Sequence, residues 1–357
     1  MPTAPRLDNL GHDVGQNDVE PNSPPRWHAH WAREATRYIA APLVNQSDVA
    51  FRLLCLRHGC KMTFTQMYLA NDLIGDPALF RQLRRELELG RKLREKQENF
   101  PQIVQLAGDD PQQLYDAAQS LSDLADGFDL NLGCPQRRAQ KGHYGAYLLN
   151  LKDWPLVNAL VRSLSQVGLP VSVKLRLCEQ TERTAELALQ LANSGASMIT
   201  LHARHASTAR RRYGAARLEV VAEIVKRIQE AGLADSVVII SNGNVRSLED
   251  VRRNLAATGA DGAMVGEHLL ENPALFSGQE VQPLELCRQY LWLVDQVEHA
   301  DGAVPRLEYI KQHLLYIIDT DRFRPPSKER AFMVNDIKAA GSHDALRDIV
   351  NNCKIAS

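Results

Sequence analysis

The chain has 357 residues, 44% hydrophobic and 24% charged, with a formal net charge of −1, which suits a soluble globular protein with one domain of about 250 residues and an appendage. The near-neutral charge excludes a generally basic surface, so any RNA contact must come from local basic clusters. No apolar run approaches the roughly 18 residues that cross a bilayer, and the first thirty residues lack the apolar block of a secretory signal, so we expect an intracellular protein, cytoplasmic or nuclear.

The chain alternates between short apolar runs and amphipathic segments. Residues 1–36 precede this pattern, are polar with several prolines, and are expected to be a disordered extension. Predicted strands cover residues 38–43, 62–65, 103–107, 127–132, 171–177, 198–202, 237–241 and 262–265. Predicted helices include residues 81–96, 111–124, 154–167, 181–193, 218–231 and 248–257. Eight β-then-α units favour an α/β fold, a (β/α)8 TIM barrel over residues 37–282, rather than an open doubly wound sheet.

The alternation stops after Asn272-Pro273. Residues 284–299, 306–318 and 330–340 all have helical spacing. We therefore expect a second, all-helical domain over residues 283–357.

Polar residues and glycines cluster at the predicted C-terminal strand ends, where the reactive groups of such barrels gather. They are Gln66, Gln105, Asn131, Cys134, Lys174, Arg176, His202, Asn242, Gly243, Asn244 and Gly266, and the segment Pro42, Leu43 and Val44 stands at the end of the first strand. The alternation of residues 171–177 places Lys174 and Arg176 on one face, so that two cations point into the barrel mouth. The alternative is an internal ion pair, for which Asp129, one turn deeper, is the available acid.

Two further features admit two interpretations each. The segment from Ser241 to Asn244, together with Gly266, stands where barrels of this kind commonly bind phosphate, although turn formation alone also explains Asn-Gly after a strand. Cys134 follows a predicted buried strand, where a thiol is placed to act on a ligand, although a lone cysteine is more often a small buried hydrophobe. The six cysteines include no CxxC pair, which argues against both disulfides and a metal site.

Taken together, these residues resemble the tRNA-dihydrouridine synthase family of flavin enzymes, from about Tyr38 to Phe276. The most specific part is Asp129-Leu-Asn-Leu-Gly-Cys-Pro-Gln136 with Gly142 and Gly145-Ala146. Supporting matches are Ala41-Pro42-Leu43-Val44, Val104-Gln105-Leu106-Ala107-Gly108, Val173-Lys174-Leu175-Arg176, Leu201-His202-Ala203-Arg204, Ser241-Asn242-Gly243-Asn244 and Asn272-Pro273-Ala274-Leu275-Phe276. The Gly-Cys-Pro-Gln form is most similar to the eukaryotic branch that acts on D-loop positions 16 and 17.

The resemblance implies an FMN-binding barrel that reduces the C5–C6 bond of uridine in tRNA, with NADPH as transient hydride donor. Cys134 would give a proton to C5, while hydride would reach C6 from reduced FMN. The expected FMN contacts are Pro42, Leu43, Val44, Gln105, Lys174, His202, Asn242, Gly243, Asn244, Gly266 and Glu267. Asn131 and Arg176 would lie beside the uracil. The expected protein is a monomer without a metal or a membrane partner.

Two basic clusters are candidates for tRNA phosphate contacts. The first lies by the sixth loop and comprises Arg204, Arg210, Arg211, Arg212 and Arg217. The second lies in the helical domain and comprises Arg322, Arg324, Lys328 and Arg330, for which an ordinary solvated helix junction is the alternative. Two other functions stay open: an FMN barrel acting on a free pyrimidine, like a dihydroorotate dehydrogenase, and a non-catalytic RNA-binding paralogue.

Overall fold

A computed structural model describes residues 35–94, 100–206, 214–299, 305–320 and 328–353. The predicted extension over residues 1–36 lies outside this part, apart from its last two positions. Among the described residues, no helix is long and apolar enough to cross a membrane.

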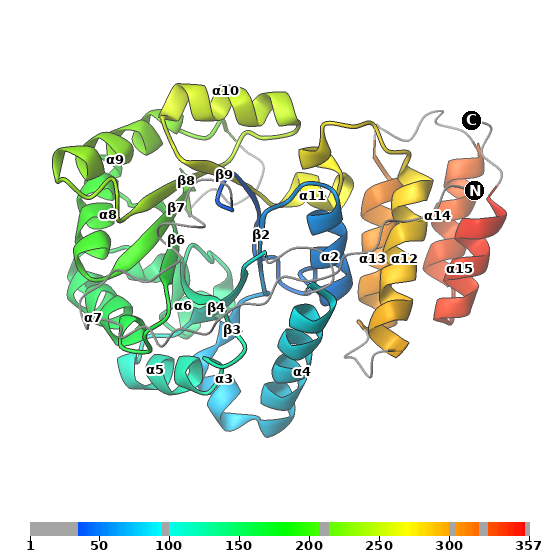
Figure 1. Ribbon diagram of the computed structural model, residues 1–357, viewed down its shortest axis with the longest axis horizontal. Helices are drawn as coiled ribbons and strands as arrows, with labels where there is room; N and C mark the ends of the chain where they lie inside the picture. Colours follow the sequence, from blue (N-terminus) through cyan, green and yellow to red (C-terminus); the bar gives the residue numbers. More distant parts are fainter. Residues whose placement is uncertain (1–34, 95–99, 207–213, 300–304, 321–327, 354–357) are drawn as a thin grey trace, which may run out of the picture.

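Eight parallel strands close into a barrel (Figure 1), which confirms the predicted (β/α)8 architecture. They are β1 (Tyr38–Ala40), β2 (Met62–Phe64), β4 (Gln102–Ala107), β5 (Gly127–Leu132), β6 (Val171–Leu177), β7 (Ala196–His205), β8 (Val238–Asn242) and β9 (Gly262–Val265). The ring closes because β1 pairs with both β2 and β9, and β2 also pairs with β4. All eight lie where the sequence predicts them. The short β3 (Tyr68–Leu69) pairs with the end of β4 and continues the line of β2.

Helices surround the barrel on its outside (Figure 1). They are α2 (Val49–Arg57), α3 (Ala70–Gly75), α4 (Pro77–Arg94), α5 (Pro111–Gln119), α6 (Arg137–Lys141), α7 (Trp154–Ser165), α8 (Thr184–Asn193), α9 (Leu218–Glu230), α10 (Leu248–Thr258) and α11 (Glu267–Glu271), with 3-10 turns η1 (Gly145–Leu148), η2 (Leu151–Asp153), η3 (Thr181–Arg183) and η4 (Leu275–Ser277). Helix α2 was not predicted. Most of its side chains are buried, including Arg52, so its sequence lacks the polar stripe that reveals an amphipathic helix.

The barrel interior has two levels. An apolar plug fills one of them, formed by Ile39, Ala41, Met62, Phe64, Ile103, Met198, Val238, Ile240 and Met264. Strand alternation then places polar residues further along the same inward faces, as in β7, where Met198 is followed by Thr200 and His202. The barrel is therefore closed by apolar side chains below and lined by polar side chains at its rim, meaning the C-terminal ends of the strands.

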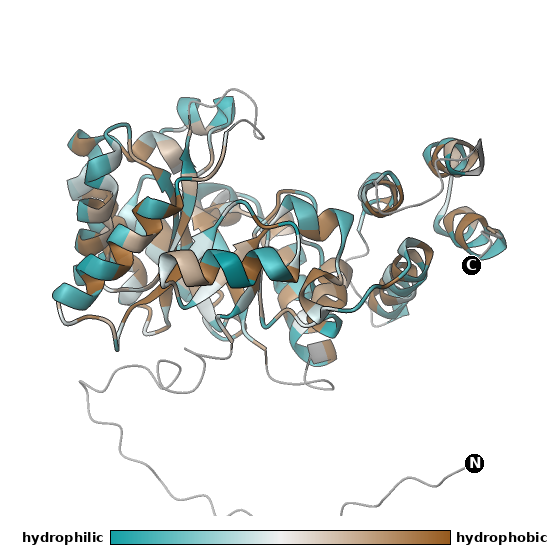
Figure 2. Cartoon of the chain, turned by 90° about the horizontal axis from the view of Figure 1, so that it is seen from above, coloured by the Kyte–Doolittle hydropathy of each residue, from teal (hydrophilic) through white to brown (hydrophobic). Residues whose placement is uncertain are grey.

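In the part of the chain that the structure describes, four helices follow the barrel: α12 (Pro283–His299), α13 (Leu307–Ile318), α14 (Lys328–Ala339) and α15 (His343–Asn352). The first three confirm the predicted helices, whereas α15 was not predicted. Figure 2 shows these helices as a group beside the barrel, with both hydrophobic and hydrophilic residues in the group. Whether residues 283–357 form a domain of their own stays a prediction.

The helical group meets the barrel through a buried polar contact that we call the joint, made of Asp48, Phe51, Tyr290 and His313. The fully buried ring of His313 stacks on Phe51 with centroids 4.6 Å apart, and its Nε2 lies 2.9 Å from Asp48 Oδ2. The hydroxyl of Tyr290 donates to the same oxygen at 3.2 Å, and the backbone N–H of Phe51 donates to Asp48 Oδ1 at 2.9 Å. One carboxylate thus links the start of α2 with α12 and α13.

Candidate active site

Strand pairing assembles the predicted site residues on the rim. Asn131 of β5 is paired with Lys174 of β6, and Arg176 of β6 is paired with His202 of β7. His202 is in turn paired with Asn242 of β8. Four neighbouring strands therefore bring these side chains together, as the alternation of each strand predicts.

Cys134 lies in a turn that is held by hydrogen bonds from side chains of the barrel strands. The side-chain oxygen of Asn131 accepts hydrogen bonds from the backbone N–H groups of Gly133 and Cys134, at 3.0 and 2.9 Å. Arg176 donates from Nε to the carbonyl of Gly133 at 2.9 Å, and from Nη1 to the carbonyl of His205 at 3.2 Å. These bonds leave the Cys134 side chain partly exposed at the end of β5.

The segment Gly145-Ala146 contacts the same turn from the other side. The backbone N–H of Ala146 donates to the carbonyl of Cys134 at 3.1 Å. Gly145 adopts φ 67°, and a Cβ at this position would lie 2.8 Å from that carbonyl oxygen. Glycine is therefore required here both by backbone conformation and by space. The spacing from Cys134 to Gly145-Ala146 has a structural cause.

Below the turn, three polar side chains form a continuous chain of hydrogen bonds. Asn131 Nδ2 donates to Gln105 Oε1 at 2.9 Å, and Gln105 Nε2 donates to Asp129 Oδ2 at 2.6 Å. The hydroxyl of Ser172 donates to the other oxygen of Asp129, also at 2.6 Å. Burial raises the pKa of Asp129 to about 6, against the lowering effects of these two hydrogen bonds and the charge of Lys174.

Lys174 extends into the barrel mouth without a protein partner. Within the described part of the chain, no hydrogen bond or ion pair holds its ammonium group, and Asp129 is bonded instead to Gln105 and Ser172. Lys174 and Asp129 are therefore not joined by a direct ion-pair contact, although the charge of each acts on the pKa of the other. Burial and the neighbouring Arg176 lower the pKa of Lys174 to about 8, while Asp129 opposes this shift. Beside it in the strand register, the hydroxyl of Thr200 is buried with no hydrogen-bond partner among the described residues.

Of these two donors the Thr200 hydroxyl is fully buried, whereas Lys174 is partly exposed to the barrel mouth. Buried polar groups in native proteins are nearly always hydrogen-bonded. An ammonium and a hydroxyl that face the same barrel mouth fit a ligand rich in oxygen acceptors. Sequence reasoning missed Thr200, although its alternation with Met198 and His202 places it on the inward face.

His202 lies in a cationic environment. Burial and the charges of Lys174, Arg176 and Arg204 hold its pKa well below the usual range, so the ring is neutral. Arg204 Nη1 lies 3.1 Å from His202 Nε2, and Arg204 also donates to Asn244 Oδ1 at 2.8 Å and to the carbonyl of Gly214 at 3.1 Å. Arg204 is thus bonded inside the rim, and its predicted contact with RNA stays a prediction.

The end of β8 is explained largely by contacts within the protein. Asn242 Nδ2 donates to the carbonyl of Met264 at 2.7 Å, and Asn244 Oδ1 accepts from the backbone N–H of Ala216 at 2.9 Å. Gly243 has φ 132°, and a Cβ there would lie 2.7 Å from Ala216 Cβ. Turn formation therefore accounts for this Asn-Gly-Asn sequence, and a role in phosphate binding stays a prediction.

The remaining predicted cofactor contacts lie in loops at the rim. Pro42, Leu43 and Val44 follow β1, where the backbone N–H of Leu43 donates to Ser47 Oγ at 2.8 Å. Gly266 precedes α11, and a Cβ on it would meet only Leu43 and Ala41, at 3.4 and 3.5 Å. Burial lowers the pKa of Arg204, and the charge of Glu267 opposes this shift, which places these two charges within electrostatic reach.

Most of the predicted RNA-binding cations cannot be placed. Arg210, Arg211, Arg212, Arg322 and Arg324 lie outside the described residues, as does the side chain of Lys328. Arg217 donates to Glu219 and Thr181, at 2.9 and 3.0 Å, and Arg330 forms a 2.7 Å ion pair with Asp319. The described members of both clusters are therefore partly neutralised or already bonded.

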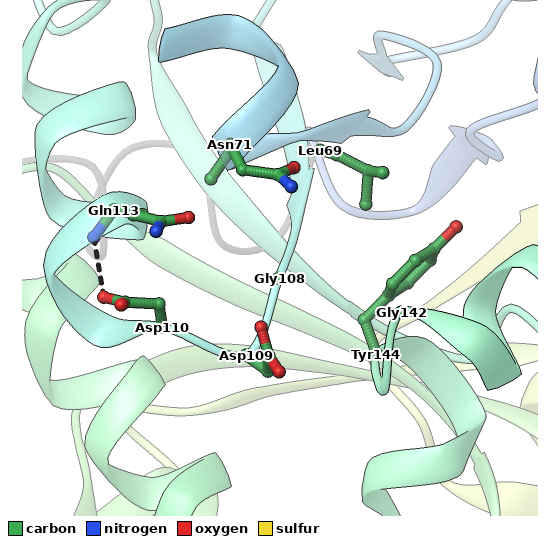
Figure 3. Close-up of a pocket in the computed structure, with 9 residues that line it drawn as sticks. Leu69, Asn71, Gly108, Asp109, Asp110, Gln113, Gly142 and Tyr144 are labelled. Atoms are coloured by element: carbon green, nitrogen blue, oxygen red, sulfur yellow. Dashed lines mark hydrogen bonds between the residues drawn. The ribbon is translucent and has the colours of Figure 1, made fainter. Parts of the chain in front are cut away.

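A small hollow lies beside the segment that follows Cys134 (Figure 3). It is lined by Asn71, by Gly108, Asp109 and Asp110 after β4, and by Gly142 and Tyr144, among others. Its volume of about 50 Å³ leaves room for one or two waters but not for a ring cofactor. In the described part of the chain, no group of three or more His, Cys, Asp or Glu side chains is arranged to bind a metal ion.

Comparison with known proteins adds a family to this geometry. A family model described as "Dihydrouridine synthase (Dus)" matches residues 39–345. A mouse protein named "tRNA-dihydrouridine(16/17) synthase [NAD(P)(+)]-like" is 33% identical over 80% of this chain, which spans 56% of the mouse protein's length. A human "tRNA-dihydrouridine(20a/20b) synthase [NAD(P)+]-like" protein is 34% identical over 79% of this chain and 81% of its own. The structure of a 2-naphthoyl-CoA reductase complex aligns with a TM-score of 0.51 at 11% identity, over 67% of this chain and 49% of that one, which reflects the fold alone.

Proposed function

This chain belongs to the dihydrouridine synthase family, and we propose that it reduces a uridine of tRNA to dihydrouridine. The observation that carries the proposal is the fastened turn of Cys134 beside the unpaired Lys174 on one rim. A thiol presented next to an ammonium group without a protein partner is suited to proton transfer onto a ligand that the ammonium group binds.

We propose FMN as the resident cofactor, held by Pro42 to Val44, Gln105, Lys174, His202, Asn242 to Asn244 and Gly266 with Glu267. The unpaired ammonium of Lys174 and the unpaired hydroxyl of Thr200 support this assignment, because a flavin offers ring oxygens and nitrogens to such donors. When bound and reduced by NADPH, FMN supplies the hydride that adds to C6 of the uracil. Lys174 would stabilise negative charge on the ring system, and neutral His202 would contribute a hydrogen bond without adding charge.

Cys134 would donate a proton from Sγ to C5 as the hydride arrives at C6. Positioning is the main contribution of the protein to such a step, because the donor must face one carbon of a planar ring. Asn131 and Arg176 provide that positioning through their bonds to the backbone of the turn. In the proposed complex they also border the uracil.

tRNA is the proposed partner, bound by a single copy of the chain in the cytoplasm or nucleus. The arginines around residues 204–217 and the helices after residue 283 are the proposed contacts for its phosphates. The motif resemblance suggests D-loop positions 16 and 17, as in the name of the mouse relative. The human relative is named for positions 20a and 20b, so the modified position is the most informative product measurement.

The test uses purified holoprotein and tRNA transcripts. We expect a yellow protein that forms dihydrouridine with NADPH, detected by mass mapping of the tRNA. Cys134→Ala should keep the flavin and lose uridine reduction. Cys353→Ala is the matched control, because Cys353 is the other partly exposed cysteine of the described chain and lies after the last helix.

Three outcomes would contradict the proposal. A purified protein that does not bind flavin would exclude the proposed dihydrouridine synthase activity. A flavoprotein that reduces or oxidises a free pyrimidine but leaves tRNA unchanged would support the dihydroorotate dehydrogenase-like alternative. Binding of tRNA without any reduction would support the non-catalytic paralogue.

A further inference from the structure

The chain of hydrogen bonds below Cys134 ends at a buried carboxylate whose role lies beyond cofactor or substrate contact. It runs from Asp129 through Gln105 and Asn131 to the backbone N–H of Cys134, and we call it the relay. Its members come from strands β4 and β5 and the turn after β5. Asp129 is fully buried, and Gln105 is 1% exposed.

The relay has a direction that is set at both of its ends. A backbone N–H can only donate, so Asn131 must turn its oxygen toward Cys134 and its amide nitrogen toward Gln105. An ionised carboxylate can only accept, so Gln105 must turn its nitrogen toward Asp129 and its oxygen toward Asn131. The two amides therefore have one consistent orientation while Asp129 carries its charge.

We propose that Asp129 is a positioning residue for Cys134, and that it acts through Gln105 and Asn131 to hold the turn in the geometry that proton donation requires. This inference rests on the proposed function for its catalytic meaning. Whether Asp129 holds the Cys134 turn in place does not depend on the proposed reaction, because the hydrogen bonds involved lie within the protein. Asp129 touches neither the thiol nor, in the proposed complex, the substrate.

Neutral Asp129 would weaken this control. A protonated carboxyl can donate as well as accept, so Gln105 is able to reverse, and a reversed Gln105 turns an N–H toward the N–H of Asn131. A hydrogen bond to a charged acceptor is also roughly twice as strong as one between neutral groups. The turn should therefore loosen as Asp129 gains its proton.

The groups around Asp129 determine the pH at which it gains its proton. From β6, Ser172 donates to its Oδ1, and Lys174 is the charged group that acts on it. From β4, the neutral Gln105 donates to its Oδ2. Because the bond from Ser172 favours the ionised form, its removal should move the transition to higher pH, whereas removal of the carboxylate should abolish it.

The experiment measures maleimide labelling of Cys134 relative to Cys353 in the holoprotein between pH 5 and 8, read by mass spectrometry. The other four cysteines are buried, so the two partly exposed thiols provide the signal and its internal reference. In the wild type we expect the ratio to rise about threefold as pH falls through about 6. Asp129→Asn should give the raised ratio at every pH. Ser172→Ala should keep the step and shift it to higher pH.

A second measurement links the relay to turnover. Pre-reduced holoenzyme is mixed with tRNA in a single turnover, and we expect Asp129→Asn to slow the reduction about tenfold at pH 7.5, with the rate expressed per bound flavin and little change in the tRNA concentration that gives half of the maximal rate. A pH-independent labelling ratio in the wild type, or a step that persists in Asp129→Asn, would overturn the proposal. If Asp129→Asn does not fold, an unshifted step in Ser172→Ala overturns it.

These outcomes separate the inference from the proposed function. A wild type that labels with the expected step but never reduces tRNA would contradict the function and leave the relay standing. A wild type that reduces tRNA, together with an Asp129→Asn variant that does so equally fast, would contradict the inference alone.

Discussion

Asp48 at the joint and Asp129 in the barrel mouth are both shielded carboxylates, but their surroundings shift their pKa values in opposite directions. Burial raises the pKa of each. At Asp48 this effect is outweighed by His313, the backbone N–H of Phe51 and Arg52, so the net shift is downward. Among the described residues, Asp129 receives hydrogen bonds from the uncharged Ser172 and Gln105, and burial raises its pKa to about 6 despite these bonds and the charge of Lys174.

The difference separates a carboxylate that stabilises the fold from one that costs stability. Lowering of the pKa on folding means that ionised Asp48 favours the native state, whereas ionised Asp129 disfavours it. A buried carboxylate that costs stability and lies next to a candidate active site is typical of a functional position. Mutations at the joint should therefore mainly lower the free energy of unfolding, whereas mutations in the barrel mouth should mainly lower activity.

The largest expected effect is at the joint. Asp48→Ala leaves His313 buried without its acid and removes the acceptor of Tyr290, so we expect a loss of about 4 kcal/mol in the free energy of unfolding, measured in urea. Ser247→Ala is the matched control, because Ser247 caps α10 at an exposed N-terminus and its loss should cost only about 1 kcal/mol. Equal losses in the two variants would mean that Asp48 acts as a cap and nothing more.

Gly145→Ala should disturb the mouth more than its backbone conformation alone explains. The new Cβ would press on the carbonyl of Cys134, and we expect a loss of about 3 kcal/mol with a larger relative loss of tRNA reduction than of flavin binding. Gly168→Ala provides the comparison, since Gly168 also has positive φ, at 78°, but open space around its Cβ position. It should cost about 1 kcal/mol and leave activity unchanged. If both variants lose activity alike, close contact with Cys134 is not the cause.

Asp129→Asn should raise the free energy of unfolding and lower the rate of uridine reduction. The folded pKa of about 6 lies above the reference value of 3.8, so the wild type loses stability as pH rises through this window. We expect the variant to be more stable by about 2 kcal/mol at pH 8, and the advantage to vanish below pH 4. Urea unfolding of the flavin-free forms at both pH values measures it. An equal or lower stability at pH 8 would contradict the comparison with Asp48.

The smallest effect is expected outside the joint, at another contact between α2 and α12. Arg57 lies over the ring of Trp292 at 4.3 Å, and Trp292 is 45% exposed. Trp292→Ala should cost about 1 kcal/mol and leave tRNA reduction unchanged. Phe332→Ala, which removes a more exposed ring of α14, should be close to neutral in the same unfolding measurement. A large loss of activity in Trp292→Ala would show that this contact also serves the active site.

Local patterns predicted the strands and the faces they present. The bounds of β5, β6 and β9 agree with the sequence, because their alternation and glycine boundaries are strong, and the same alternation placed Asn131, Lys174 and Arg176 on the inward face. Helix α2 was missed because its buried surface leaves no polar stripe.

The relay and the joint were beyond the reach of sequence alone. The relay depends on the register of β4, β5 and β6, which decides that Asp129 meets Gln105 and Ser172 rather than Lys174. The joint brings Asp48 against residues of α12 and α13 from the other end of the chain. Local periodicity contains no information on either pairing.

The apolar plug of the barrel has a kinetic consequence for the proposed reaction. Side chains such as Phe64, Ile103 and Met264 close the barrel below the polar level, so a ring bound at the rim is reached only from the side where the strands end. The nicotinamide of NADPH and the target nucleotide of tRNA would then enter from the same side and occupy the same space beside the bound ring. The two substrates must take turns, and excess NADPH should compete with tRNA for the reduced enzyme.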